Sequence, residues 1–191
     1  MKRKIMLSLV LVLFIGTGMI KGQASGNSVI DVILSSYTAR TFIAEPVSDS
    51  DIKLILQCGI KAPSARNSQM WKFTVVKDDE LCADIVRGHK SGNVVILVSG
   101  QENAREGINV DFDCALATEN MFIAAVGLGL GAHIYTGPVS NINSNMKEVL
   151  EVPEGYRVVS VLQIGHIDKN VDATSSASTR NSYEEIVNYK E

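Results

Sequence analysis

The hydrophobic positions along the chain predict both strands and helices. Four short runs are rich in β-branched and aromatic residues, as is typical of strands. They are residues 73–77, 93–98, 133–136 and 157–165. Continuous apolarity, clearest in residues 93–98, indicates a strand covered on both faces. We therefore expect helices on both sides of one sheet.

Apolar residues recur at helical spacing between these runs. Ser48, followed by Asp51 three residues later, predicts a capped helix N-terminus, and Ile52 and Ile55 then share one helix face. This helix must end before Pro63, because proline cannot continue a helix and disfavours the helical conformation of the residue before it. Further short helices are expected at residues 31–36, 78–87, 140–150 and 183–189.

The longest expected helix runs from about residue 114 to 128, with Asp111 or Asp113 as its cap. Its sequence is apolar nearly all round, which predicts a place at the centre of the core or in a subunit interface. Glu119 and Asn120 could be read as a catalytic acid and a ligand. We favour helix packing and hydrogen bonding for both.

The first residues differ from the rest. Three basic residues, at positions 2–4, precede an uncharged apolar run at 5–20, and small residues follow up to Ala24. This order is typical of a signal peptide spanning residues 1–24, which would leave one domain, residues 25–191, exported to the periplasm or the extracellular space. An uncleaved N-terminal anchor is the alternative.

Charge and composition narrow the partners. The chain has 191 residues, 46% of them hydrophobic, which is enough for one well-packed domain. Four of its 18 basic residues lie in the leader, so the mature domain would carry 14 basic against 21 acidic residues. This balance disfavours nucleic acid and, once the leader is removed, stable association with anionic membranes.

The cysteines and histidines give no metal site. Cys58, Cys82 and Cys114 are widely spaced and odd in number, so neither a disulfide framework nor paired zinc ligands is indicated. We expect buried free thiols, with Cys58 and Cys114 on apolar helix faces. The three histidines lie in separate segments.

A polar loop connects the helix that ends before Pro63 to the strand at 73–77. Its serines and asparagine could merely satisfy backbone groups, or the loop could hold a ligand. The stretch from Ala62 to Phe73, Ala-Pro-Ser-Ala-Arg-Asn-Ser-Gln-Met-Trp-Lys-Phe, resembles the FMN-binding loop of the nitroreductase family, commonly APSxxNxQPWxF. Met70 replaces the usual proline.

A second segment, residues 37–42, resembles the opening motif of the same family, RRSxRxF. Thr38 and Arg40 stand at the matching positions, where hydroxyl and guanidinium groups hold the FMN phosphate and pyrimidine. Ser36 and Tyr37 stand where the family usually has basic residues. Without this match Arg40 would read as a surface arginine.

Three glycines at spacing two follow the long helix: Gly127, Gly129 and Gly131. They come after a helix and before a strand, the wrong order for a dinucleotide-binding phosphate loop. We expect them to end the helix and to let the backbone pass close to a flat ligand. The family's equivalent GLGxxxxxG stretch implies three candidates for flavin contact: Tyr135, Thr136 and Gly137.

Near the C-terminus, Arg180 matches the family's arginine that meets the FMN phosphate, a suitable partner for a guanidinium fork. The alternative is a solvated arginine at a helix start, where the helix dipole is mildly unfavourable to it. The preceding polar stretch, residues 172–181, is expected to be an exposed excursion.

Together these segments imply a nitroreductase-like α+β fold, with a mixed central sheet flanked by helices and an obligate homodimer with FMN in two interfacial clefts. By this resemblance, one subunit holds the phosphate and pyrimidine through Thr38, Arg40 and Arg180. The other subunit contributes its loop residues: Pro63, Ser64, Ala65 and Asn67.

The resemblance also implies the reaction. An FMN-dependent oxidoreductase would take two electrons from NAD(P)H or another donor and pass them to a nitroaromatic, quinone or similar acceptor in ping-pong order. This requires no protein nucleophile, and we assign no catalytic side chain. The alternatives are a non-catalytic flavin- or ligand-binding dimer and, disfavoured by the short 103–111 region, a specialised chemistry such as reductive dehalogenation or flavin breakdown.

Overall fold

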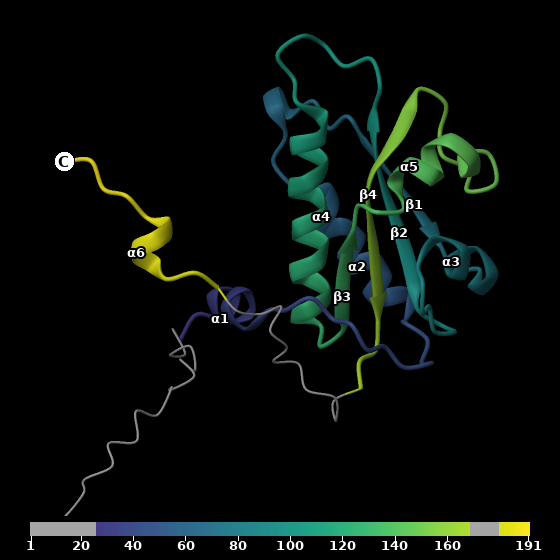
Figure 1. Ribbon diagram of the computed structural model, residues 1–191, viewed down its shortest axis with the longest axis horizontal. Helices are drawn as coiled ribbons and strands as arrows, with labels where there is room; N and C mark the ends of the chain where they lie inside the picture. Colours follow the sequence, from purple (N-terminus) through teal and green to yellow (C-terminus); the bar gives the residue numbers. More distant parts are fainter. Residues whose placement is uncertain (1–25, 169–179) are drawn as a thin grey trace, which may run out of the picture.

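The computed structural model describes residues 26–168 and 180–191, so the expected leader and most of the 172–181 stretch lie outside it. Four strands form one sheet in the order β1-β2-β4-β3 (Figure 1). Their bounds are β1 Trp71–Val76, β2 Val94–Gln101, β3 Gly131–Tyr135 and β4 Tyr156–Gly165. The helices are α1 Ser28–Ser35, α2 Asp49–Ile60, α3 Asp79–Ile85, α4 Val110–Gly127, α5 Val139–Asn141 and α6 Tyr183–Ile186.

The centre of the fold is β2, in which every side chain from Val94 to Val98 is buried. Alternate residues face opposite sides of a strand. Val94, Ile96 and Val98 belong to a core shared with α2 and α4, whereas Val95 and Leu97 belong to a core shared with α3 and Ile142. The expected helical cover on both faces of the sheet is confirmed.

The α+β fold is confirmed, but the sheet is not mixed within the described residues. All three strand pairs, β1 with β2, β2 with β4 and β3 with β4, are antiparallel. The continuous apolarity of β2 therefore reports burial on both faces, which is common in parallel sheets but does not require them.

The helix starts agree in part with the sequence. The Ser48 Oγ accepts the Asp51 amide at 3.1 Å, which confirms the predicted cap of α2. Asn109 caps α4, because its Oδ1 accepts the Phe112 amide at 3.1 Å, so the prediction of Asp111 or Asp113 as the cap is wrong. Of the helix expected at 140–150, only α5 and a π turn at Ile142–Met146 form.

Two of the three cysteines are buried free thiols as predicted. Burial raises the pKa of Cys82 to about 11 and that of Cys114 to about 12, so both stay protonated. Cys58 is exposed, contrary to the prediction. Its carbonyl accepts the Asn120 side-chain amide at 3.1 Å, which confirms the hydrogen-bonding role expected of Asn120 and ties α4 to α2.

The glycines after α4 serve the helix end and a close approach. Gly129 has φ +80° just after the helix, a conformation that glycine adopts at little cost. A Cβ on Gly131 would lie 2.2 Å from Cγ2 of Ile167 and 2.8 Å from Cβ of Ala39. The space beside Gly131 is therefore filled by side chains of the same chain. It is not the open space for a flat ligand that the sequence predicts.

We predict that Gly131→Ala lowers the free energy of unfolding by about 1–3 kcal/mol, because the added methyl group overpacks this contact. Gly127→Ala is the matched control, since a Cβ there would come no closer than 3.9 Å to its neighbours. Urea unfolding should show the control unchanged or slightly more stable. Equal loss in both variants would contradict the close approach at Gly131.

Candidate functional site

The loop that carries the first motif lies at the N-terminal end of α4. Residues Ala65–Asn67 form a single 3₁₀ turn after α2. The Ala65 amide donates to both carboxylate oxygens of Asp113, each at 3.1 Å, and Asp113 is 3% exposed. Because this amide is already engaged, Ala65 does not offer it to a ligand.

The loop has an unusual backbone conformation. Arg66, Asn67 and Gln69 have φ values of +54°, +54° and +48°. A non-glycine residue in this left-handed region costs about 1–2 kcal/mol, with asparagine the most tolerant of the three. Local bonds hold it: the Gln69 amide donates to Ser64 Oγ at 3.1 Å, and Gln69 Nε2 donates to Asn67 Oδ1 at 3.1 Å. Strain of this kind occurs frequently at ligand-binding loops.

The second motif is bound to β3. The Ala39 amide donates to the Ala132 carbonyl at 2.9 Å, and His133 Nδ1 donates to the Ala39 carbonyl at 2.8 Å. Thr38 is half-buried beside this anchored residue and Arg40 is exposed. The backbone of the motif is therefore fixed, while the Arg40 side chain faces solvent.

A stacked pair of rings lies beside Arg40. His133 and Tyr135 are parallel within 4°, with centroids 3.9 Å apart. Burial lowers the pKa of His133 and raises that of Tyr135, and the positive charge of Arg40 favours a lower pKa for both. Arg40 therefore lies close enough to the two rings for its charge to act on both.

A buried hydrogen-bond chain supports Tyr135. Its hydroxyl donates to Gln163 Oε1 at 3.0 Å, and Gln163 Nε2 donates to Asn93 Oδ1 at 3.3 Å. Asn93 Nδ2 in turn donates to the Ile43 carbonyl at 3.0 Å. The series of hydrogen bonds therefore ends at the segment that follows Arg40. Thr136 and Gly137 follow Tyr135 and are exposed, with open space around Gly137.

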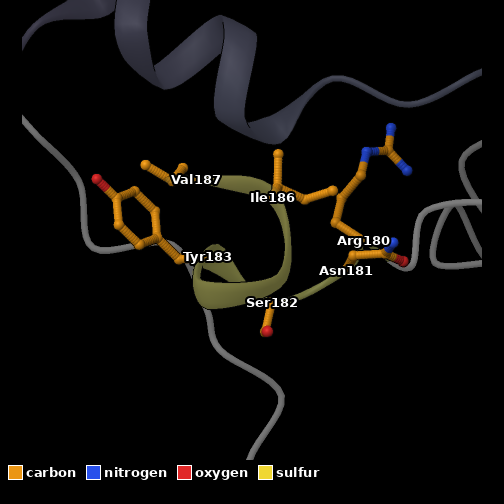
Figure 2. Close-up of a pocket in the computed structure, with 6 residues that line it drawn as sticks. All are labelled: Arg180, Asn181, Ser182, Tyr183, Ile186 and Val187. Atoms are coloured by element: carbon orange, nitrogen blue, oxygen red, sulfur yellow. The ribbon is translucent and has the colours of Figure 1, made fainter. Parts of the chain in front are cut away.

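Arg180 lies on the C-terminal segment, apart from the sheet. It lines a hollow of about 600 Å³ with Asn181, Ser182, Tyr183, Ile186 and Val187. Figure 2 shows Arg180 and Ile186 directed towards a neighbouring helix, with Ser182 on the opposite side. In Figure 1, α6 stands clear of the sheet and of α4. The segment that carries Arg180 therefore stands apart from the sheet, whereas the Arg40 segment is bound to β3 of the sheet.

The two motifs lie at opposite ends of α4 (Figure 1). The Ala65 loop contacts its N-terminal part through Asp113, whereas Ala39 pairs with β3, which follows the helix C-terminus. With 18 residues at about 1.5 Å each, α4 spans about 27 Å. A ligand of mononucleotide size cannot reach both motifs within one chain.

The donors fit FMN by their chemistry. Arg40 and Thr38 suit a phosphate, and Arg180 carries a second guanidinium. Ser64 and Asn67 offer hydroxyl and amide groups to the polar edge of a flavin ring. In the part of the chain that the structure describes, no cluster of three metal-binding side chains occurs.

Sequence reasoning missed Asp113, His133 and Gln163 as parts of this site. His133 and Tyr135 stand two apart in a predicted strand and so share a face, which is a signal that could have paired them. For Asp113 the sequence pattern predicts only a helix cap. Nothing in the local sequence connects Gln163 with Tyr135, 28 residues away.

We predict that His133 makes stability depend on pH. Because burial lowers its pKa in the folded protein, the unfolded chain takes up a proton first as the pH falls below about 6.5, and stability is lost from there downwards. His133→Gln should therefore reduce the loss of unfolding free energy between pH 8 and pH 5.5. Urea titrations at the two pH values check this, and an unaltered pH dependence would contradict it.

Comparisons with known proteins agree with the motifs. A model of the nitroreductase family matches residues 33–91 and 87–166. A protein of Archaeoglobus fulgidus, named as a candidate NADH dehydrogenase/NAD(P)H nitroreductase, is 29% identical over 147 residues, which cover 72% of this chain and 84% of the relative. An NADPH-flavin oxidoreductase of Vibrio harveyi is 27% identical over 165 residues, covering 75% and 68% respectively.

The fold is similar to that of solved nitroreductases. The crystal structure of a Bacteroides fragilis nitroreductase with bound FMN superposes with a TM-score of 0.73 at 18% identity, covering 86% of this chain and all of that one. A Desulfitobacterium hafniense nitroreductase with bound FMN gives 0.71 at 22% identity, covering 86% and 99%. With a family match across most of its length and the corresponding fold, the chain belongs to the nitroreductase family.

Proposed function

We propose that this chain is an FMN-dependent oxidoreductase that transfers two electrons from NAD(P)H to small electrophilic acceptors such as nitroaromatics or quinones. The observation that carries this is the placement of two polar motifs, one suited to a phosphate and one to a flavin edge, on a nitroreductase fold. Relatives named for NADPH and flavin support the donor and the cofactor.

Bound FMN supplies the two-electron chemistry, so the protein need only bind and orient. Arg40 would neutralise the phosphate, and Thr38 would donate to it. Arg180 lies on a segment that stands apart from the sheet, so we place it outside this half-site. His133 donates to the carbonyl of Ala39 and so holds the backbone next to Arg40. Its ring stacks on Tyr135, which donates to Gln163.

The site is completed by a second copy of the chain. Because the two motifs are separated by the length of α4, the Ala65 loop of one copy reaches the flavin held by Arg40 of the other. A two-fold dimer then contains two complete sites, since each copy gives both halves.

The outer surface supports this dimer. Large apolar side chains are exposed on α1, at the two ends of α4 and on the C-terminal segment, as expected of an interaction surface. They are Val29, Ile30, Ile33, Leu34, Phe112, Leu128, Tyr183, Ile186 and Tyr189. Phe112, 60% exposed in the first turn of α4, lies near the Ala65 loop and so close to the proposed shared site.

Export of the domain is part of the proposal. It rests on the order of basic, apolar and small residues in positions 1–24, which lie outside the described residues. In the described part of the chain, no helix has the length and apolarity needed to cross a membrane.

The direct test of the activity is spectroscopic. Protein incubated with FMN and freed of excess should be yellow, bleach anaerobically with NADH or NADPH, and regain its colour with a quinone or nitroaromatic. Failure to bind FMN would contradict the proposal. Binding without bleaching across a panel of donors would favour a non-catalytic flavin-binding dimer instead.

We predict that Arg40→Ala weakens FMN binding by about 10- to 100-fold, because a charge-assisted hydrogen bond to the phosphate is lost. Flavin fluorescence titration measures this. Arg87→Ala, another exposed arginine beyond α3, is the control and should bind FMN as the wild type does. Equal affinity of the Arg40 variant and wild type would remove Arg40 from the site.

We predict that Phe112→Asp converts the dimer to a monomer and abolishes FMN binding together with it, because a charge replaces an apolar contact at the interface. Val149→Asp, at a residue 56% exposed and apart from α1 and α4, is the control. Sedimentation velocity with and without FMN checks both. A folded monomer of Phe112→Asp that still binds FMN tightly would argue against the shared site.

A further inference from the structure

The contact between Ala65 and Asp113 has a role beyond packing. We propose that Asp113 is a positioning residue: it holds residues 64–69 in the strained conformation that presents Ser64 and Asn67 to the flavin. The flavin part of this inference rests on the proposed function.

The contact is long-range and buried. Asp113 is 48 residues away from Ala65 in sequence and is 3% exposed, and both of its carboxylate oxygens accept the same amide at 3.1 Å. Burying a carboxylate that accepts no hydrogen bond destabilises the folded protein. Asp113 therefore needs the bond to the Ala65 amide. Asp113 lies in the N-terminal part of α4, where the helix dipole favours a negative charge and a strong acceptor.

The loop depends on this contact for its position. Among hydrogen bonds within the described residues, those to Asp113 alone connect residues 64–69 to another element. The remaining bonds are local: Asn67 N to Ser64 O, Ser68 N to Ala65 O, Gln69 N to Ser64 Oγ, and Gln69 Nε2 to Asn67 O and Oδ1. The two ends of the loop are held by other contacts: Ala62 and Trp71 are buried in the core shared with α4, and the Met70 carbonyl accepts the Gln101 amide at 3.0 Å. Between these ends, the bonds to Asp113 connect the loop itself to α4.

The loop backbone is strained, and we infer that the tether, the bond between Asp113 and the Ala65 amide, keeps it in that conformation. Arg66 and Gln69 have positive φ without being glycine or asparagine, and such conformations persist only where the surroundings enforce them. If the tether is removed, the loop should relax towards ordinary backbone angles. Asn67, between these two residues, would then lose its orientation.

A glycine in place of Arg66 tests whether Asp113 acts by opposing this strain. It adopts positive φ at little cost, so Arg66→Gly removes part of the strain without restoring the tether. If Asp113 acts by opposing strain, Arg66→Gly should recover function in an Asp113 variant. A purely structural role of Asp113 in the core predicts no such recovery.

The first test needs no flavin. Trypsin can cleave the chain after Arg66, which is exposed. The rate of cleavage at this one site is measured by mass spectrometry on the protein without FMN. Asp113→Asn, nearly isosteric, and Asp113→Ala should both raise its rate about 10-fold, with global unfolding checked by circular dichroism. Asp111→Ala is the control, because Asp111 lies in the same part of α4 but is exposed and pairs with Arg157. An unchanged cleavage rate in a folded Asp113→Asn protein would overturn the tether.

The second test uses FMN affinity. Asp113→Asn should weaken binding by about 10-fold, and Asp113→Asn with Arg66→Gly should recover most of the loss. Faster cleavage with unchanged affinity, or no recovery in the double variant, would overturn the positioning role and leave the proposed function intact. Wild-type protein that binds no FMN would refute the proposed function and the flavin part of this inference, and the trypsin experiment would still decide whether Asp113 holds the loop.

Discussion

The burial of β2 on both faces is the constraint on which the rest of the structure depends. Because Val94 to Val98 are all buried, one layer of helices must cover each side of the sheet, and α4 is the long element that covers one side. The two ends of α4 then determine where the two motifs lie. The Ala65 loop is tied to its N-terminal part through Asp113, and the Arg40 segment is tied to β3 beyond its C-terminus. The core thus dictates the separation of the half-sites.

In the proposed dimer, that separation couples FMN binding to assembly. Neither motif alone offers groups for both the phosphate and the flavin ring, so two chains would share the binding free energy. A ligand that binds only the dimer stabilises it by mass action. The proposed arrangement, in which each copy would be half of two sites, accounts for the exposed apolar side chains on α1 and at the C-terminus and for the solvent-facing side chain of Arg40.

Much of this was predictable from the sequence, where local chemistry decides the outcome. The Ser48 cap, the strand buried on both faces and the hydrogen-bonding role of Asn120 all follow from residue type and spacing. Strand direction did not follow, since apolarity reports burial only. The roles of Asp113 and Gln163 depend on partners 48 and 28 residues away, and the exposure of Cys58 depends on how α2 turns against α4.

Subunit complementation tests the shared site most directly. One chain would carry Thr38→Ala with Arg40→Ala, and the other Asn67→Ala with Asp113→Asn, so that each homodimer has two defective sites. In a mixed dimer the two different kinds of defect fall in the same site, which leaves the other site intact. The account predicts that unfolding and refolding the two chains together restores tight FMN binding at one site per mixed dimer, with NAD(P)H-dependent bleaching. Mixed dimers that bind no more FMN than the parent homodimers would contradict it.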